Sequence, residues 1–206
     1  MTGQLIYNFI NSLFKIPRSI TGDGVRISLN KIKNEHLSDL KIHEVPTGTV
    51  IGDWIVPNEW NIFDAYIKNS KGEKVLTLKD TNLHVVGYSD PVNIKLPLNE
   101  LDKHLYSLPD QPNAIPYVTS YYRETWGFCL SQDQRQKLTD DIYHAHIDAK
   151  KSIGSLTYAD LIIEGKEEKE IFFSTYICHP QMANNELSGP AVATYLAKWL
   201  LKRSNR

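Results

Sequence analysis

The stretch that decides the fold is residues 171–201, IFFSTYICHPQMANNELSGPAVATYLAKWLL. Its first part is a continuous apolar run, too short for a helix and rich in aromatic and branched residues. Such a run predicts a buried strand in a sheet that is covered on both faces. The strand is expected to stop at His179 and Pro180, and Ser188 can cap the helix that follows. The stretch therefore predicts a strand, a polar loop and a helix.

Polar residues gather where this strand should end, namely His179 and the run Asn184–Glu186. In open α/β sheets, ligands bind in the loops at the carboxyl ends of the strands. A histidine there can present a neutral imidazole to a metal, and an oxygen side chain of the next loop can complete the pocket. On chemistry alone, two interpretations stay open for His179, a metal ligand and a hydrogen-bonded structural residue.

The same stretch resembles the first metal-binding segment of the zinc-dependent aminopeptidases that use two co-catalytic metals. In that family a strand ends in a histidine ligand, and a loop of the type Ala-x-Asp-Asn-x-Ser-Gly supplies the aspartate that bridges two zinc ions. Alignment on Ala183 and Ser188 places Asn185 at the bridging position. The resemblance is strongest to the bacterial aminopeptidase-like domain proteins, much of whose length is a domain of unknown function. Five motifs carry it, which are RSITGDGVR (18–26), DWIVPNEW (53–60), LPDQPNAIPY (108–117), TSYYRETWGFC (119–129) and GSLTYADLIIEG (154–165).

The resemblance implies zinc as the cofactor, one or two ions in the complete protein, with His179, Asn185 and Glu186 as candidate ligands. Asn185 replaces the bridging carboxylate by a neutral amide, which is a weaker ligand for two cations. Gln181 replaces an aspartate that would orient the imidazole. Glu186 can supply a carboxylate if the loop shifts, or it can simply favour the helix N-terminus and face water. The general-base glutamate, a further carboxylate ligand and a final histidine are expected beyond Arg206, so the chain is either the N-terminal half of a longer protein or a truncated product.

The predicted fold class is α/β, a zinc-aminopeptidase-like domain with a mixed sheet flanked by helices and interrupted by a small β-rich inserted domain. Residues 1–46 and 117–206 are assigned to the peptidase-like domain, because two amphipathic helical patterns precede a strand at residues 41–45. Residues 47–116 are assigned to the inserted domain, because short β-like runs alternate there with turn residues. His144 and His146 alternate along a predicted strand and should share one face, as exposed residues and not as a metal site.

Composition limits the remaining function classes. The 206 residues are 41% hydrophobic and 23% charged with a net charge of −1, so nothing favours nucleic acid or an anionic membrane. The two cysteines, Cys129 and Cys178, lack CxxC spacing, and a reduced cytoplasmic location fits best. No secretory or membrane-spanning apolar run is present in the sequence.

The expected function is zinc-dependent hydrolysis of a peptide or amide bond in a small peptide-like substrate. The alternative is a catalytically inactive binding or scaffold protein with a peptidase fold. The inserted domain could serve recognition or pairing with another subunit, which leaves a homo-oligomer open.

Overall fold

The computed structural model describes residues 2–203 and divides the chain into two compact units, each of mixed α/β structure. Unit 1 contains Met1–Asn58 and Ile153–Arg206, and unit 2 contains Glu59–Ser152. These limits differ from the predicted 47–116. Residues 47–58 belong to unit 1, because Thr47 and Gly154 exchange hydrogen bonds of 2.9 and 3.1 Å. Residues 117–152 belong to unit 2, because its last strand pairs with its first.

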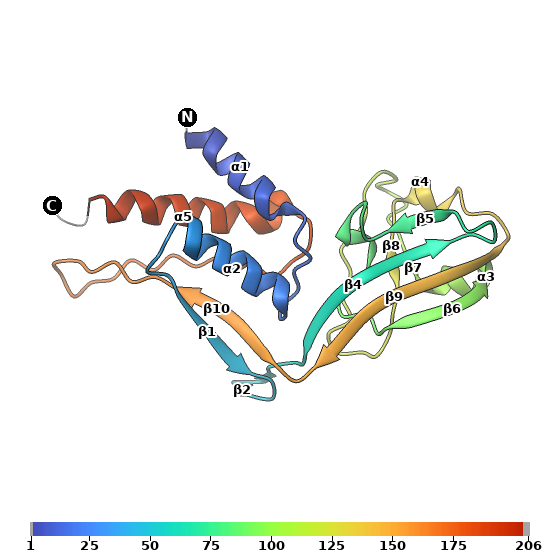
Figure 1. Ribbon diagram of the computed structural model, residues 1–206, viewed down its shortest axis with the longest axis horizontal. Helices are drawn as coiled ribbons and strands as arrows, with labels where there is room; N and C mark the ends of the chain where they lie inside the picture. Colours follow the sequence, from blue (N-terminus) through green and yellow to red (C-terminus); the bar gives the residue numbers. More distant parts are fainter. Residues whose placement is uncertain (1, 204–206) are drawn as a thin grey trace. The chain divides into compact units, whose positions relative to one another are not determined.

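Within residues 2–203, unit 1 has the α-helices α1 (Thr2–Phe14), α2 (Asp23–Glu35) and α5 (Ser188–Leu201) (Figure 1). Strand β1 (Lys41–Pro46) pairs in antiparallel fashion with β10 (Ser155–Asp160). The short strands β2 (Val50–Ile51) and β3 (Trp54–Ile55) form a second antiparallel pair. The helices and the strand at 41–45 were predicted by the sequence and are confirmed. None of the helices in residues 2–203 is long and apolar enough to cross a membrane.

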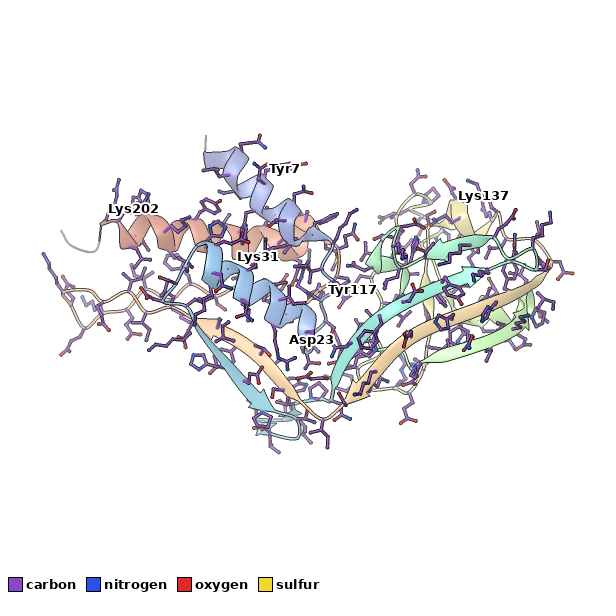
Figure 2. The ribbon with its side chains drawn as sticks, in the orientation of Figure 1. Tyr7, Asp23, Lys31, Tyr117, Lys137 and Lys202 are labelled. Carbon is purple, nitrogen blue, oxygen red and sulfur yellow. The ribbon has the colours of Figure 1, made fainter. Side chains whose placement is uncertain are left out.

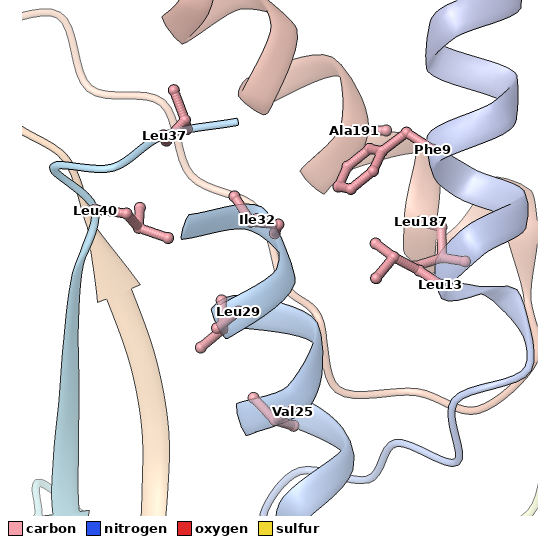
Figure 3. Packing of buried hydrophobic residues seen from close by; sticks show 9 residues of the cluster. All are labelled: Phe9, Leu13, Val25, Leu29, Ile32, Leu37, Leu40, Leu187 and Ala191. Carbon is pink, nitrogen blue, oxygen red and sulfur yellow. The ribbon is translucent and has the colours of Figure 1, made fainter. Parts of the chain in front are cut away.

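The core of unit 1 lies between α1, α2 and α5. Apolar residues at helical spacing on α1 and α2 turn inward, and the start of α5 closes the cluster (Figure 3). Tyr7 lies on the side of α1 that faces away from this core and is exposed to solvent (Figure 2). The buried members are Phe9, Leu13, Val25, Leu29, Ile32, Leu37, Leu40, Leu187 and Ala191.

The connection between α1 and α2 approaches α2 closely. A Cβ atom at Gly24 would collide with the backbone carbonyl oxygen of Pro17, so the first turn of α2 accepts only glycine at this point. Gly22, just before the helix, has a φ of +99°, which also favours glycine. The residue after Pro17 is Arg18, whose side chain is directed into unit 1 and is only 2% exposed. The glycine-rich turn thus brings a guanidinium group into the interior of the unit.

The predicted buried strand at residues 171–178 does not form. The chain from Leu161 to Met182 contains no strand, and Ile171 and Phe172 are 84% and 88% exposed (Figure 1). The physical reason is the lack of a neighbour, since no strand among the described residues pairs with this segment. Ser188 is not the helix cap either, because a π-helical turn, Ala183–Leu187, runs directly into α5.

Unit 2 is built on a four-stranded antiparallel sheet in the order β5-β4-β9-β6. Ala145 and Ile147 of β9 face its core, whereas His144 and His146 share the opposite face beside Tyr66, as the alternation predicted. The sheet strands are β4 (Glu59–Lys68), β5 (Lys74–Thr77), β6 (Val92–Pro97) and β9 (Ile142–Ser152). The remaining elements are the parallel pair β7 (Leu105–Tyr106) and β8 (Phe128–Cys129), the short helices α3 (Leu98–Leu101) and α4 (Gln132–Arg135), and the 3-10 turns η1 (Asn82–His84) and η2 (Asp102–His104).

Candidate functional site

Three side chains that can bind a metal meet at the entry to α5 in unit 1. One ligand atom each from Cys178, His179 and Glu186 lies within 4.8 Å of the other two. Cys178 and His179 lie near the end of the strand-free chain from Leu161 to Met182, here called the extended segment, and Glu186 belongs to the π-helical turn. A π-helical turn widens the backbone spiral and is frequent at functional sites. Here it directs Glu186 inward and leaves Asn185 exposed.

The carboxylate of Glu186 holds His179 at two points. Its Oε1 accepts a 2.8 Å hydrogen bond from the backbone N–H of His179. Its Oε2 lies 2.8 Å from Nδ1 of the imidazole, an ion-pair contact when the ring is protonated. The Glu186 side chain is fully buried, so the backbone N–H of His179 replaces water at Oε1, whereas the approach of Oε2 to the ring is an ion-pair contact without hydrogen-bond geometry. One side chain therefore fixes both the backbone and the ring of His179.

Arg18 holds the other side of the same residue. Its Nε donates a 3.0 Å hydrogen bond to the carbonyl oxygen of His179, and one terminal nitrogen donates a 2.7 Å bond to the carbonyl oxygen of Leu13. Burial lowers the pKa of Arg18 to about 10, and the nearby Glu186 and Cys178 oppose that shift. The guanidinium therefore stays charged at neutral pH and links the end of α1 to the site.

The thiol of Cys178 completes the cluster, with Sγ 3.2 Å from Nδ1 of His179. Contacts with Cys178 and Glu186 raise the pKa of His179 to about 9, although burial acts in the opposite direction. The imidazole is thus protonated at neutral pH unless a metal displaces the proton. Arg18, Glu186 and His179 lie side by side as a positive, a negative and a positive group. Opposite charges placed next to one another in this way offset the desolvation of buried ionised groups.

The extended segment and α5 approach each other closely beside this cluster. A Cβ atom at Gly189 would clash with the side-chain oxygen of Thr175. Gly189 is the glycine of the Ala-x-Asp-Asn-x-Ser-Gly loop pattern described above. Its role here is steric, since only a hydrogen at position 189 leaves room for Thr175. This contact fixes the segment that carries Cys178 and His179 against the start of the helix.

The structure brings together two of the three predicted ligands, His179 and Glu186. The alternative in which Glu186 faces water is wrong, because its side chain is fully buried. Sequence reasoning missed Cys178 and Arg18 as members of the site. The available signals were the position of Cys178 next to His179 and the place of Arg18 at the head of the motif RSITGDGVR.

The donor set fits a zinc ion in chemical type. Thiolate, imidazole and carboxylate are the three protein ligands that zinc prefers, and catalytic zinc sites use three of them with an open fourth position. The three ligand atoms lie within 4.8 Å of one another, which is close enough for one cation to contact all of them. The guanidinium of Arg18 acts against an added cation, since it already compensates the charge of Glu186.

Known proteins resemble the chain over almost its whole length. Residues 7–206 match the profile of a family described as "Domain of unknown function (DUF4910)". A protein of Clostridium acetobutylicum named "Putative polysaccharide biosynthesis protein with aminopeptidase-like domain" is 51% identical over 201 residues, which are 98% of this chain and 46% of that protein. A crystal structure of a "putative peptidase" from Clostridium acetobutylicum has 51% identity and a TM-score of 0.94, and the match covers 98% of this chain and 47% of that one. The chain thus spans less than half the length of these relatives.

Proposed function

Because the chain belongs to the DUF4910 family, we propose that it carries the first metal-binding loop of a zinc-dependent hydrolase of peptide or amide bonds. The predicted relation to aminopeptidase-like domain proteins is supported, since one relative that is 51% identical to the chain is named for an aminopeptidase-like domain and the similar crystal structure is described as a putative peptidase. In this proposal unit 1 is part of a zinc-aminopeptidase-like fold, and the strand-rich unit 2 is its inserted domain. The substrate class is a small peptide-like molecule, and the location is the cytoplasm.

The observation that carries the proposal is the convergence of Cys178, His179 and Glu186 at the start of α5. His179 and Glu186 would hold the zinc, with Cys178 as a third donor, whereas the exposed Asn185 lies outside this cluster. A bound zinc supplies a Lewis acid that polarises the substrate carbonyl and lowers the pKa of a water molecule. The general-base glutamate is assigned to sequence that this chain does not contain.

The residues of the chain prepare His179 for this role. Glu186 holds the backbone N–H of His179 and Arg18 holds its carbonyl oxygen, so the peptide at the site is fixed on both sides. Fixing a ligand in advance lowers the entropy lost on binding. The histidine must release its proton when zinc binds, because only the neutral imidazole is a ligand.

Zinc content tests the proposal directly. We expect about one zinc per chain by elemental analysis after metal is added and excess is removed, and a loss of that zinc in His179→Ala. His43→Ala is the matched control, because His43 lies on β1 of the same unit and is not part of the cluster. A chain that takes up no zinc, or a His179→Ala variant that keeps it, would overturn the metal assignment.

A second candidate function is a peptidase-fold binding protein that has no catalytic activity. It is favoured by the exposed amide of Asn185 in place of a bridging carboxylate and by the compensation of Glu186 by Arg18. The polypeptide to test is the longer protein, because the missing ligands are assigned to it. Zinc uptake with amide-bond hydrolysis by that protein supports the hydrolase, whereas peptide binding without zinc supports the second candidate.

A further inference from the structure

The segment Ile171–Ile177 of unit 1, the open segment, has the composition of a strand but no strand partner. It reads IFFSTYI, and aromatic and β-branched residues of this kind are enriched in strands. Its backbone groups form no hydrogen bonds with other backbone groups among residues 2–203. Ile171, Phe172, Phe173 and Tyr176 are 84%, 88%, 61% and 50% exposed. Few soluble proteins leave such a run of large apolar side chains uncovered.

The open segment also lacks the features that protect natural sheet edges. Exposed edges usually carry lysine, proline or inward-pointing charges that discourage pairing. Residues 171–177 contain no charge and no proline, whereas the preceding residues 165–170, GKEEKE, are almost all charged. The sequence therefore changes from a solvated loop to a pairing strand at Ile171.

The C-terminal end of the open segment is held in position. Ile177 packs against the core cluster of unit 1, and Thr175 fits against Gly189. Immediately after it, His179 is fixed by Glu186 and Arg18. A partner strand would thus meet a segment that is already oriented at one end, so pairing costs less conformational entropy.

We propose that the open segment is an inner strand of a larger sheet, and that the part of the protein corresponding to the unmatched half of its relatives supplies the neighbouring strands. The relatives are 51% identical to the chain, yet it covers only 46% and 47% of their lengths. A strand that is apolar on both faces is typical of the interior of a sheet, with neighbours on both edges. A second copy of the chain joined by one two-fold contact would pair one edge of the segment and leave the other open.

Hydrogen exchange tests the proposal in two polypeptides. One is this chain alone, and the other is this chain joined in the order of the Clostridium relative to the portion of that relative that it does not match. Amide exchange across 171–177 should slow by at least about tenfold in the joined protein, because paired strand amides open only with local unfolding. The charged residues 165–170 serve as an internal reference that should not slow. Equal exchange in the two polypeptides would overturn the proposal.

A proline substitution separates strand pairing from general burial. Ser174→Pro removes one backbone donor in the middle of the open segment and should abolish protection of its neighbours in the joined protein. Lys169→Pro makes the same change in the charged loop and should leave the protection intact. Circular dichroism of both variants checks that the helices of unit 1 remain folded. Sedimentation of the chain alone tests the alternative that a second copy of the chain pairs with the open segment. A dimer in which the open segment is protected from exchange would overturn the proposal.

Discussion

Glu186→Gln is expected to destabilise unit 1 by about 3 kcal/mol. The fully buried carboxylate accepts the backbone N–H of His179 at 2.8 Å and pairs with its ring at 2.8 Å, next to the buried Arg18. Removing one member of a buried ionic group costs about 3–5 kcal/mol, because the remaining charges lose their compensation. Glutamine keeps an acceptor for the N–H, and a neutral hydrogen bond recovers about 1 kcal/mol of this loss. The net change lowers the ratio of folded to unfolded protein by roughly a hundredfold.

Urea denaturation followed by circular dichroism at the helical wavelength measures this change, since the long helices α1, α2 and α5 all belong to unit 1. Glu35→Gln is the control, because Glu35 is 49% exposed in a surface pair with Lys31 and such pairs contribute at most about 0.5 kcal/mol. If Glu186→Gln costs less than about 1 kcal/mol, or no more than the control, the carboxylate does not hold His179 as the structure indicates.

Three further outcomes are expected. Cys178 and Glu186 raise the pKa of His179 from 6.5 to about 9, and an NMR titration of the histidine should show this value. The stability that the protonated ring gives to unit 1 should be complete below about pH 6.5 and should be lost as the pH rises toward 9. A pKa of His179 near 6.5 would contradict this expectation. Gly24→Ala should cost about 1–3 kcal/mol in urea denaturation through its backbone collision, while Gly165→Ala, where nothing lies within 4 Å, should stay within about 0.5 kcal/mol. Burial raises the pKa of Cys129 to about 12, so mass spectrometry after iodoacetamide treatment should find Cys178 modified first, and equal rates would refute the buried placement.

The local elements were predictable from the sequence because their signals are local. The 3.6-residue spacing of apolar side chains identified both N-terminal helices, and the alternation around His144 identified the faces of β9. The open segment shows the limit of such signals. Its composition is that of a strand, but a strand exists only with a neighbour, and composition does not say whether the neighbour is present.

In the candidate site, too, contacts between residues close in sequence were predictable and contacts between distant residues were not. His179 and Glu186 are seven residues apart on either side of one turn, so their meeting could be anticipated from the loop. Arg18 reaches His179 from 161 residues away, and no periodicity or spacing in the chain reports such a contact. The limits of unit 2 escaped prediction for a related reason, since they depend on the pairing of β4 with the distant β9.

The pairing of β4 with β9 also bears on how the chain can be rearranged. Glu59, where unit 2 begins, is the register partner of Ser152, where it ends. Unit 2 is inserted into unit 1 between Asn58 and Ile153, and its own strand pairing holds its first and last residues together. The insertion therefore adds little of the loop-closure entropy that an unstructured loop of the same length would cost unit 1. We therefore expect that replacing unit 2 by a tight turn leaves the core of the helices around Arg18 and His179 in place, because that core contains residues of unit 1 alone.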